Sequence, residues 1–487
     1  MSKSLLVASL AGAATVFGFA PFEVLPIPVL TLALLFHLWR RADSAPGAAW
    51  LGLAWGLGCF LAGVSWVYVS LHDVGGMAMP LAAIATLLFC GGLALFPALV
   101  GYLFRRAATT DFRAIPLAAG LWTLAEWLRG WLLTGFPWLA IGYSQTPPSP
   151  LAGYAQVVGV YGVGLLVAGV ASCLTFAWRR PLAWLAIGIV VAGGAGLRTI
   201  TWTRPAGEPL NASLLQGDVP QSLKWVPENL RLSMDTYARL AAEHPARLTV
   251  LPETAIPLPF DRIPEEFLRR LTAAGPVLMG AAIRDRSGGY VNGALAVTPE
   301  LSIASYAKVH LVPFGEFVPP GFGWFFGLVD IPMSNFSAGA RQQRPLDVAG
   351  QKIMPNICYE DLFGEELLAA LPDATLLVNL SNTAWFGDSL AQPQHLQIAR
   401  LRALETGRMI LRATNTGMTA AITPDGRVTA ALPPFTAGAL EVAAQGFSGL
   451  TPFARFGNTL AAWLACLAVA VAVLRRRVNG RGGIGVN

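Results

Sequence analysis

The sequence predicts a polytopic α-helical membrane bundle of about eight spans, interrupted by one inserted α/β domain. Two observations predict this fold class. Hydrophobic residues make up 54% of the chain and charged residues only 13%, and the apolar residues are gathered into long runs instead of amphipathic patterns. Between Pro205 and Pro452 the composition changes to that of an ordinary globular protein, over enough chain to bury a core.

The apolar runs are candidates for membrane-spanning helices, which need roughly 20 residues each. They cover residues 4–20, 24–39, 50–70, 80–104, 114–133, 151–178, 181–198 and 457–474. The first two runs are short for full spans. The expected domains are a transmembrane bundle of about seven spans over residues 1–204, an extracytoplasmic α/β domain over 205–452, and a final span with a basic tail over 453–487.

Positively charged residues between the runs predict the orientation, because loops rich in lysine and arginine stay in the cytoplasm. They fall in alternate loops, with Arg129 as an exception. The basic loops contain Lys3, Arg40, Arg41, Arg105, Arg106, Arg113, Arg179, Arg180 and Arg475 to Arg477. Both termini are then cytoplasmic, and the α/β domain faces outward. These residues account for most of the formal net charge of +6, which favours membrane anchoring over nucleic-acid binding.

Within the α/β domain, short apolar runs alternate with helical patterns, as expected for an α/β fold. The strands are expected at Leu210–Leu215, Leu248–Leu251, Pro276–Ala282, Ala294–Thr298, Ile303–Ala307, Lys352–Cys358, Ala374–Leu380, Met409–Thr414 and Thr419–Ile422. The helices are expected at 227–243, 262–274, 362–371 and 390–408. Asp425 and Gly426 predict a hairpin turn between the last strand and the segment that follows.

Cys358 is the only cysteine of the α/β domain, so it cannot form a disulfide there. The other cysteines lie in apolar runs, where cysteine behaves as a small hydrophobe: Cys59, Cys90, Cys173 and Cys466. A lone thiol kept in an oxidising compartment is a candidate nucleophile. The alternative is a buried, inert cysteine.

Glu253 and Lys308 are the candidate partners of this thiol, and each closes an expected strand as Cys358 does. Open α/β sheets bind ligands at the carboxyl ends of their strands. There Glu253 suits a general base, and Lys308 suits a fixed cation that stabilises an oxyanion or a thiolate. The alternatives are a solvated loop carboxylate and a surface lysine.

The motifs around these residues resemble the Glu-Lys-Cys triad of the nitrilase superfamily. They are LPETAIP with Glu253, YAKVHLVPFGEFVP with Lys308 and NICYEDLF with Cys358. The membrane half resembles the apolipoprotein N-acyltransferase family within it, through EWLRGWLLTGFPW at 126–138 and GYSQ at 142–145. So does VPQSLKW at 219–225, at the start of the inserted domain. The resemblance covers nearly the whole chain and implies a nitrilase-like αββα sandwich for the inserted domain.

The resemblance also implies the roles of the site residues. Glu253 would be the general base, Lys308 the oxyanion stabiliser, and Cys358 the nucleophile that carries the acyl group as a thioester. Positions matching the active-site surroundings are Glu316, Tyr359 and Glu360, and candidates for substrate contact are Trp225, Asn292, Trp138 and Tyr143.

The implied reaction takes an acyl chain from a phospholipid and transfers it, by ping-pong catalysis, to the free α-amine of a diacylglyceryl-modified N-terminal cysteine on a bacterial apolipoprotein. The implied location is the inner membrane, with the inserted domain in the periplasm. We expect membrane lipids as partners and no cofactor or metal, since the sequence contains no metal-ligand cluster or nucleotide-binding loop. Gly315–Phe326 and Thr383–Ser389 are candidate entrance loops, or ordinary interface packing.

Two other functions remain open at this point. A membrane-tethered amidase or nitrilase would hydrolyse a carbon–nitrogen bond with the same triad. A transport or receptor protein would only bind a ligand, with Cys358 in its core. The spans contain few ionisable residues at mid-depth, which disfavours a transporter.

Overall fold

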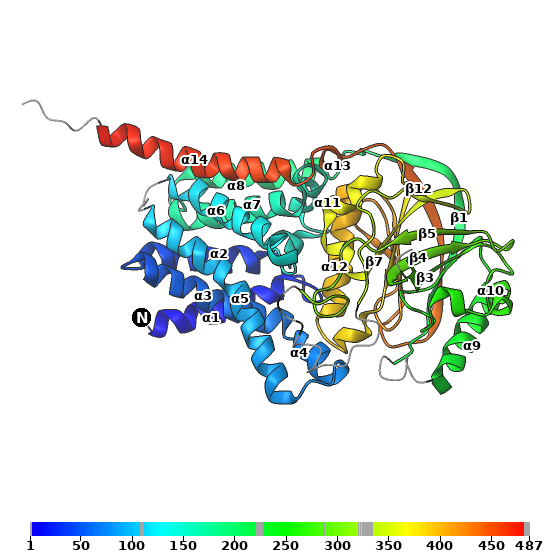
Figure 1. The fold of residues 1–487 in the computed structure, drawn as a ribbon. Coiled ribbons are helices and arrows are strands. Elements are labelled where there is room, and N and C mark those ends of the chain that lie inside the picture. Colours follow the sequence, from blue (N-terminus) through cyan, green and yellow to red (C-terminus); the bar gives the residue numbers. More distant parts are fainter. Residues whose placement is uncertain are drawn as a thin grey trace, which may run out of the picture. The chain divides into compact units, whose positions relative to one another are not determined.

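The computed structural model describes residues 2–107, 112–220, 227–285, 288–319, 321, 323 and 335–481. Its internal contacts divide the chain into two compact units, both drawn in Figure 1. The helical unit comprises Met1–Ser65, Ala83–Ile200 and Phe456–Asn487. The α/β unit comprises Trp66–Ala82 and Thr201–Arg455, so it includes a short segment between two apolar helices.

A helix lies at each of the predicted apolar runs. These helices are α1 (Ser2–Thr15), α2 (Pro26–Arg41), α3 (Ala45–Val64), α5 (Met79–Arg106), α6 (Ala114–Arg129), α7 (Ala155–Phe176), α8 (Pro181–Leu197) and α14 (Thr459–Arg481). Within the described part of the chain, three helical segments are long and apolar enough to cross a membrane: Ala45–Val64, Met79–Arg106 and Pro150–Phe176. Ser2–Gly18, Pro181–Leu197 and Thr459–Leu474 are apolar but shorter. These helices support a membrane protein, and the number of spans stays a prediction.

Glycine allows two of these helices to approach closely. A Cβ atom at Gly12 of α1 would overlap the carbonyl oxygen of Trp55 in α3, and one at Gly58 of α3 would overlap that of Ser9 in α1. Small residues at reciprocal positions let backbones come together, which is how helices gain packing energy where lipid removes the hydrophobic driving force.

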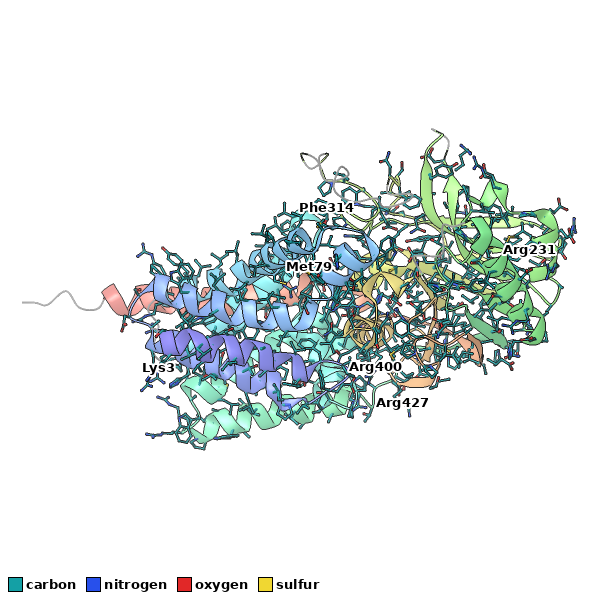
Figure 2. The ribbon with its side chains drawn as sticks, turned by 90° about the horizontal axis from the view of Figure 1, so that it is seen from below. Lys3, Met79, Arg231, Phe314, Arg400 and Arg427 are labelled. Carbon is teal, nitrogen blue, oxygen red and sulfur yellow. The ribbon has the colours of Figure 1, made fainter. Side chains whose placement is uncertain are left out.

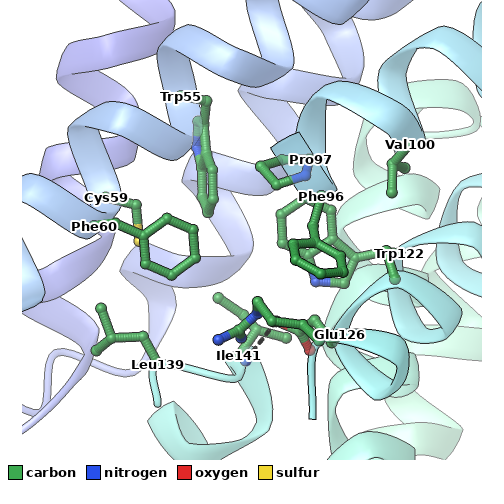
Figure 3. A pocket seen from close by; sticks show the side chains of 12 residues that line it. Trp55, Cys59, Phe60, Phe96, Pro97, Val100, Trp122, Glu126, Leu139 and Ile141 are labelled. Atoms are coloured by element: carbon green, nitrogen blue, oxygen red, sulfur yellow. Dashed lines mark hydrogen bonds between the residues drawn. The ribbon is translucent and has the colours of Figure 1, made fainter. Parts of the chain in front are cut away.

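Figure 3 shows a cavity inside the helical unit, with about 370 Å³ of empty volume including open space. Its lining residues are Trp55, Cys59, Phe60, Phe96, Pro97, Val100, Trp122, Ala125, Glu126, Arg129, Leu139 and Ile141. The two charged side chains in this lining hold a neighbouring irregular segment. Glu126 Oε1 accepts from the Ile141 N–H at 2.8 Å, and Arg129 Nη1 donates to the Trp138 carbonyl at 2.7 Å.

The described residues of the α/β unit form two six-stranded sheets. In order across the first sheet lie β12 (Gly438–Ser448), β1 (Arg204–Gln216), β2 (Leu248–Val250), β3 (Val277–Arg284), β4 (Tyr290–Val297) and β5 (Ile303–Ala307). Across the second lie β11 (Val428–Ala431), β10 (Ala420–Ile422), β9 (Ile410–Thr414), β8 (Leu376–Ser381), β7 (Gln351–Ile357) and β6 (Leu346–Val348). The central strands β1, β2 and β3 are parallel, as are β7, β8 and β9, and the outer pairs are antiparallel.

Helical crossovers make the central strands parallel. They contain α9 (Pro227–Glu243), α10 (Glu265–Leu271), α11 (Gly364–Leu367) and α12 (Ala391–Thr406). Figure 1 shows α9 and α10 on one side of the strands and α11 and α12 on the other. Alternate residues of β3 face different cores: Leu278 packs between the sheets, whereas Val277 and Met279 pack with the helix residues of α9 and α10. The layers are therefore α, β, β and α.

Helix α9 shows how one layer is attached. Tyr237, Leu240 and Ala241 are buried on one face, whereas Arg231, labelled in Figure 2, and Arg239 lie on the exposed face. This spacing of apolar residues is that of an amphipathic helix. Burial against the sheet fixes α9 in place, since exposed ion pairs such as those of its arginines contribute at most about 1 kcal/mol each.

The predicted strands and helices of this unit are confirmed to within a few residues, and so is the turn at Asp425 and Gly426. Strands β6, β11 and β12 were not predicted. β12 reads GALEVAAQGFS, with little β propensity, and forms because it pairs with β1 from Gly438 to Ser448. Pairing with a neighbour outweighs weak intrinsic preference in a strand.

Candidate active site

Three strand ends meet in the α/β unit. Glu253 follows β2, Lys308 follows β5 directly, and Cys358 follows β7 directly. All three residues are buried, with exposed fractions of 7%, 1% and 7%. Lys308 Nζ lies 3.5 Å from Glu253 Oε1, and the charges of both residues act on the Cys358 thiol. The structure thus brings together the three residues that the sequence singled out.

Two further side chains complete a buried polar cluster around Lys308. Glu316 lies 2.9 Å from Lys308 Nζ. Asn292 Nδ2 donates to Glu253 Oε1 at 2.7 Å and to Glu316 Oε1 at 2.6 Å, so one amide bridges the two carboxylates. The predicted positions Glu316 and Asn292 therefore lie in the same cluster as Glu253 and Lys308, where Asn292 orients both carboxylates.

Lys308 is a fixed cation. Burial acts to lower its pKa, but the negative charges of Glu316 and Glu253 outweigh burial, and the net pKa is raised. The ammonium group therefore stays protonated at neutral pH and cannot serve as a base. It can stabilise negative charge that develops nearby, which is the function of an oxyanion-binding group.

Cys358 lies at a sharp turn between β7 and the short 3₁₀ helix Cys358–Leu362. Its φ is +51°, a left-handed conformation that side chains other than glycine seldom adopt. Burial, followed by the charge of Glu253, raises the pKa of the thiol, against the opposing effect of Lys308. The resting thiol is therefore neutral, and a nucleophilic attack requires a base to remove its proton.

The carboxylate of Glu253 is held by hydrogen bonds at both of its oxygens. Its Oε2 accepts from the Asn382 N–H at 2.9 Å, opposite the bond from Asn292 to Oε1. Gly280 in β3 packs against its backbone, where a Cβ atom would lie 2.6 Å from the Glu253 Cα. Asn382 was missed by the sequence reasoning, although it follows β8 and the same strand-end criterion would have found it.

Glu360 is a buried carboxylate two residues after Cys358. Its Oε1 accepts from Tyr306 Oη at 2.9 Å and from the Val309 N–H at 2.7 Å, and its Oε2 accepts from the Ile357 N–H at 2.7 Å. It thereby connects the segments that carry Lys308 and Cys358. Burial raises the pKa of Glu360 to about 7, although the charge of Lys308 opposes the shift.

Substitution of Glu360 by glutamine is expected to destabilise the α/β unit by about 2 kcal/mol, because the amide NH₂ must face a backbone N–H. Tyr306→Phe, which removes one donor only, is expected to cost about 1 kcal/mol.

The raised pKa of Glu360 favours the folded state below the unfolded value of 4.5, and this contribution is lost as pH rises through about 7. The melting temperature difference between wild type and Glu360→Gln should therefore be larger at pH 4.5 than at pH 8, as measured by differential scanning fluorimetry. A difference that does not change with pH would contradict this account.

The predicted loop Thr383–Ser389 begins as a short 3₁₀ helix, Thr383–Phe386. It packs against the segment Trp66–Ala82 of the same unit. Ser70 Oγ donates to the Trp385 carbonyl at 2.7 Å, and the rings of Trp66 and Phe386 lie 4.6 Å apart. The loop is therefore attached to a segment that connects two apolar helices.

Among the described residues, the side chains at the other predicted positions are not part of the polar cluster around Lys308. Tyr359 is buried with its ring against Phe363. Trp138 and Tyr143 are buried inside the helical unit, each 1% exposed, and a role in lipid contact stays a prediction. Trp225 and most of the stretch 320–326 lie outside the described residues. In the ranges that the structure covers, no group of three or more His, Cys, Asp or Glu side chains is placed to hold a metal.

Comparison with known proteins gives the family. A model described as the apolipoprotein N-acyltransferase N-terminal domain matches residues 11–173, and one described as carbon-nitrogen hydrolase matches residues 212–446. The apolipoprotein N-acyltransferase of Nitrosomonas europaea is 51% identical over 473 residues, which are 94% of each chain. The chain belongs to the apolipoprotein N-acyltransferase family. The member from Chromobacterium violaceum is 47% identical over 98% of this chain and 95% of its own, and that from Ralstonia nicotianae is 46% identical over 97% and 94%.

Membership of the apolipoprotein N-acyltransferase family confirms the resemblance noted in the sequence. The carbon-nitrogen hydrolase match spans the strands from β1 to β12, with all three strand-end residues inside it. The N-terminal match falls on apolar helices. The chain is thus a carbon-nitrogen hydrolase domain combined with the helical region of this family.

Proposed function

We propose that this protein transfers a fatty acyl chain from a phospholipid to the α-amine of the diacylglyceryl-modified N-terminal cysteine of bacterial apolipoproteins. Family membership supports this reaction. The single observation that supports the chemistry is the burial of a thiol, a carboxylate and an ammonium group at three strand ends, with the two charged groups 3.5 Å apart.

In the first half-reaction, Cys358 attacks the ester carbonyl of the phospholipid while Glu253 takes the thiol proton. Lys308 and the backbone N–H of Tyr359 stabilise the oxyanion. The tetrahedral intermediate collapses, the ester C–O bond breaks, and Glu253 returns the proton to the departing alkoxide. Lysophospholipid leaves, and the acyl chain stays on Cys358 as a thioester.

In the second half-reaction, the acceptor amine attacks the thioester. An α-amine has a pKa of about 8, so much of it is protonated at neutral pH, and Glu253 takes the proton that the attack releases. The C–S bond breaks, an amide forms, and the thiol recovers its proton. Because the first product leaves before the acceptor enters, the kinetics are ping-pong.

Both substrates are lipids, which accounts for the apolar helices in this chain. Each CH₂ of an acyl chain costs about 0.8 kcal/mol to expose to water, so the chain should reach the thiol from the bilayer. We place the protein in the inner membrane with about eight spans, the domain 205–452 in the periplasm and both termini in the cytoplasm. We keep Gly315–Phe326 and Thr383–Ser389 as candidate entrance loops, and Trp225, Trp138 and Tyr143 as candidate substrate contacts.

The experiment is intact-protein mass spectrometry after incubation of the purified protein with phospholipid and no acceptor. Wild type should gain the mass of one fatty acyl group, and Cys358→Ala should not. Addition of a diacylglyceryl-cysteine peptide should discharge the adduct and give the N-acyl peptide.

The control separates transfer from hydrolysis. An adduct that water discharges as fast as the peptide does would favour a membrane-tethered hydrolase of the same superfamily. Absence of an adduct in folded wild type, or an adduct of equal yield in Cys358→Ala, would refute the thioester mechanism.

A further inference from the structure

A second buried polar cluster lies behind the turn of Cys358, and the chemistry above does not use it. It consists of Asp361 in the 3₁₀ turn, His395 in α12 and Arg412 in β9, none of them more than 1% exposed. Arg412 Nη1 donates to Asp361 Oδ2 at 3.0 Å and to Asn379 Oδ1 at 2.7 Å. The guanidinium group is therefore anchored on two sides.

Arg412 also determines which nitrogen of His395 carries the proton. Its Nη2 lies 2.9 Å from His395 Nδ1, and a guanidinium nitrogen can only donate. His395 Nδ1 must therefore accept, so the imidazole is neutral and its proton is on Nε2. Burial, followed by the charge of Arg412, lowers the pKa of His395 well below its usual value, in agreement with a neutral ring.

The protonated nitrogen faces the nucleophile's backbone. His395 Nε2 lies 3.2 Å from the carbonyl oxygen of Cys358 and donates to it, whereas Asp361 Oδ2 is farther, at 3.7 Å. Asp361 belongs to the same turn as Cys358. Hydrogen bonds thus link the Cys358 carbonyl to His395, His395 to Arg412, and Arg412 to Asp361. They form a ring that begins and ends on this turn.

The turn needs such support. Cys358 has a φ of +51°, and a side chain other than glycine stays in that conformation only where surrounding contacts hold it. Helix α12 makes a second contact of this kind one turn earlier. Gln392 Nε2 donates to the carbonyls of Thr383 at 3.0 Å and Gly387 at 3.2 Å, and so holds the neighbouring loop.

We propose that His395 and Arg412 are positioning residues, which hold the carbonyl of Cys358 in a fixed place and thereby direct the thiol toward Glu253 and Lys308. The guanidinium group of Arg412 is fixed in place, and the neutral imidazole that is bonded to it fixes the strained turn in the same way. This role rests on the proposed nucleophilic function of Cys358, whereas the hydrogen-bonded ring can be tested apart from activity.

Two substitutions of His395 test the two ring nitrogens one at a time. In His395→Gln, the amide nitrogen takes the place of Nε2 and keeps the bond to the Cys358 carbonyl. In His395→Asn, the amide oxygen takes the place of Nδ1 and keeps the bond from Arg412. Each variant loses one of these two hydrogen bonds, so their melting temperatures should be similar, which makes them a matched pair.

His395→Asn is expected to form the acyl-enzyme about 10- to 100-fold more slowly than wild type, because a small misplacement of a reacting group has an effect of that size. The phospholipid concentration that gives half of the maximal acylation rate in a single turnover should not change, since the substituted residue does not contact substrate. His395→Gln should stay within about threefold of wild type. If the two variants lose rate equally, or if His395→Gln is the slower, the proposal is overturned.

Alkylation of Cys358 by iodoacetamide, followed on its tryptic peptide, supplies a readout that does not need acyl transfer. His395→Asn should alkylate about fivefold faster than wild type, since a released turn exposes the thiol, and His395→Gln should match wild type. This order can hold even if the thioester mechanism fails. Equal alkylation of the two variants would overturn the positioning role alone.

Arg412→Lys provides a second route if His395→Asn does not fold. Lysine keeps the charge beside Asp361 but has no planar fork to reach Asp361, Asn379 and His395 together. It should therefore show slow acylation and fast alkylation, as expected for His395→Asn. Wild-type values for both rates in folded Arg412→Lys would refute the proposal.

Discussion

Glu253→Gln is expected to slow formation of the acyl-enzyme about 10³- to 10⁴-fold at pH 7, the upper part of the range for loss of a general base. The reason is the protonation state of the thiol. Burial raises the pKa of Cys358, so the variant must rely on the small fraction of thiolate present at equilibrium. Glutamine keeps the shape of the side chain, and its oxygen can still accept a hydrogen bond from Asn292 or Asn382.

The acylation rate of Glu253→Gln is expected to rise with pH. Below the pKa of a thiol, the thiolate fraction rises tenfold per pH unit, so the residual rate of Glu253→Gln should rise about tenfold per unit between pH 7 and 9. Wild type should depend less on pH there, because its base removes the proton. Rapid-quench mass spectrometry of the acyl-enzyme measures both rates.

Glu366→Gln is the matched control for this experiment. Glu366 carries the same side chain in the same unit, but it pairs with His310 at 2.8 Å and lies partly exposed. Its substitution should change the acylation rate by no more than about threefold. A Glu253→Gln variant that acylates within tenfold of wild type at pH 7 would show that another group removes the proton.

Lys308→Met should cause two losses at once. The first is in stability, because Lys308 is 1% exposed between Glu253 and Glu316. Removing the cation from a buried ion pair leaves uncompensated charge, which costs about 3–5 kcal/mol. The second is in rate: loss of an oxyanion-stabilising group slows acylation about 10²- to 10³-fold. Differential scanning fluorimetry and acyl-enzyme kinetics measure the two effects separately.

A double substitution separates these effects from each other. In Lys308→Met with Glu316→Gln, one of the two carboxylates is neutralised, so part of the lost stability should return. The acylation rate should not return, because the cation is still absent. Recovery of the rate together with stability would mean that Lys308 acts only through folding, and an unchanged melting temperature in Lys308→Met would contradict its burial as an ion pair.

The sequence was sufficient to predict the main helices and strands, because the residue patterns that indicate them are local. Apolar runs predicted helices, and alternation of strand and helix patterns predicted the α/β unit. The failures came where a segment has no pattern of its own. β12 is built from glycine, alanine and glutamine among other residues, and its partner β1 lies more than 200 residues earlier in the chain.

The site residues also divide into those that a local pattern predicts and those that it does not. Glu253, Lys308 and Cys358 could be found because each closes a strand and each carries reactive chemistry. Asn382 was missed although it also closes a strand, since an asparagine there signals no reaction. His395 and Arg412 gave no signal, because a histidine within a helix and an arginine within a strand acquire a role only from what they contact.

The sequence by itself determined the chemistry available to this protein, a lone thiol, a carboxylate and a lysine at strand ends in a chain rich in apolar helices. Only the tertiary structure decided how these groups behave. Burial raises the pKa of the thiol, two carboxylates keep the lysine charged, and residues of α12 and β9 form hydrogen bonds at the turn of Cys358. These effects depend on distances between residues far apart in the chain, which no local pattern of residues encodes.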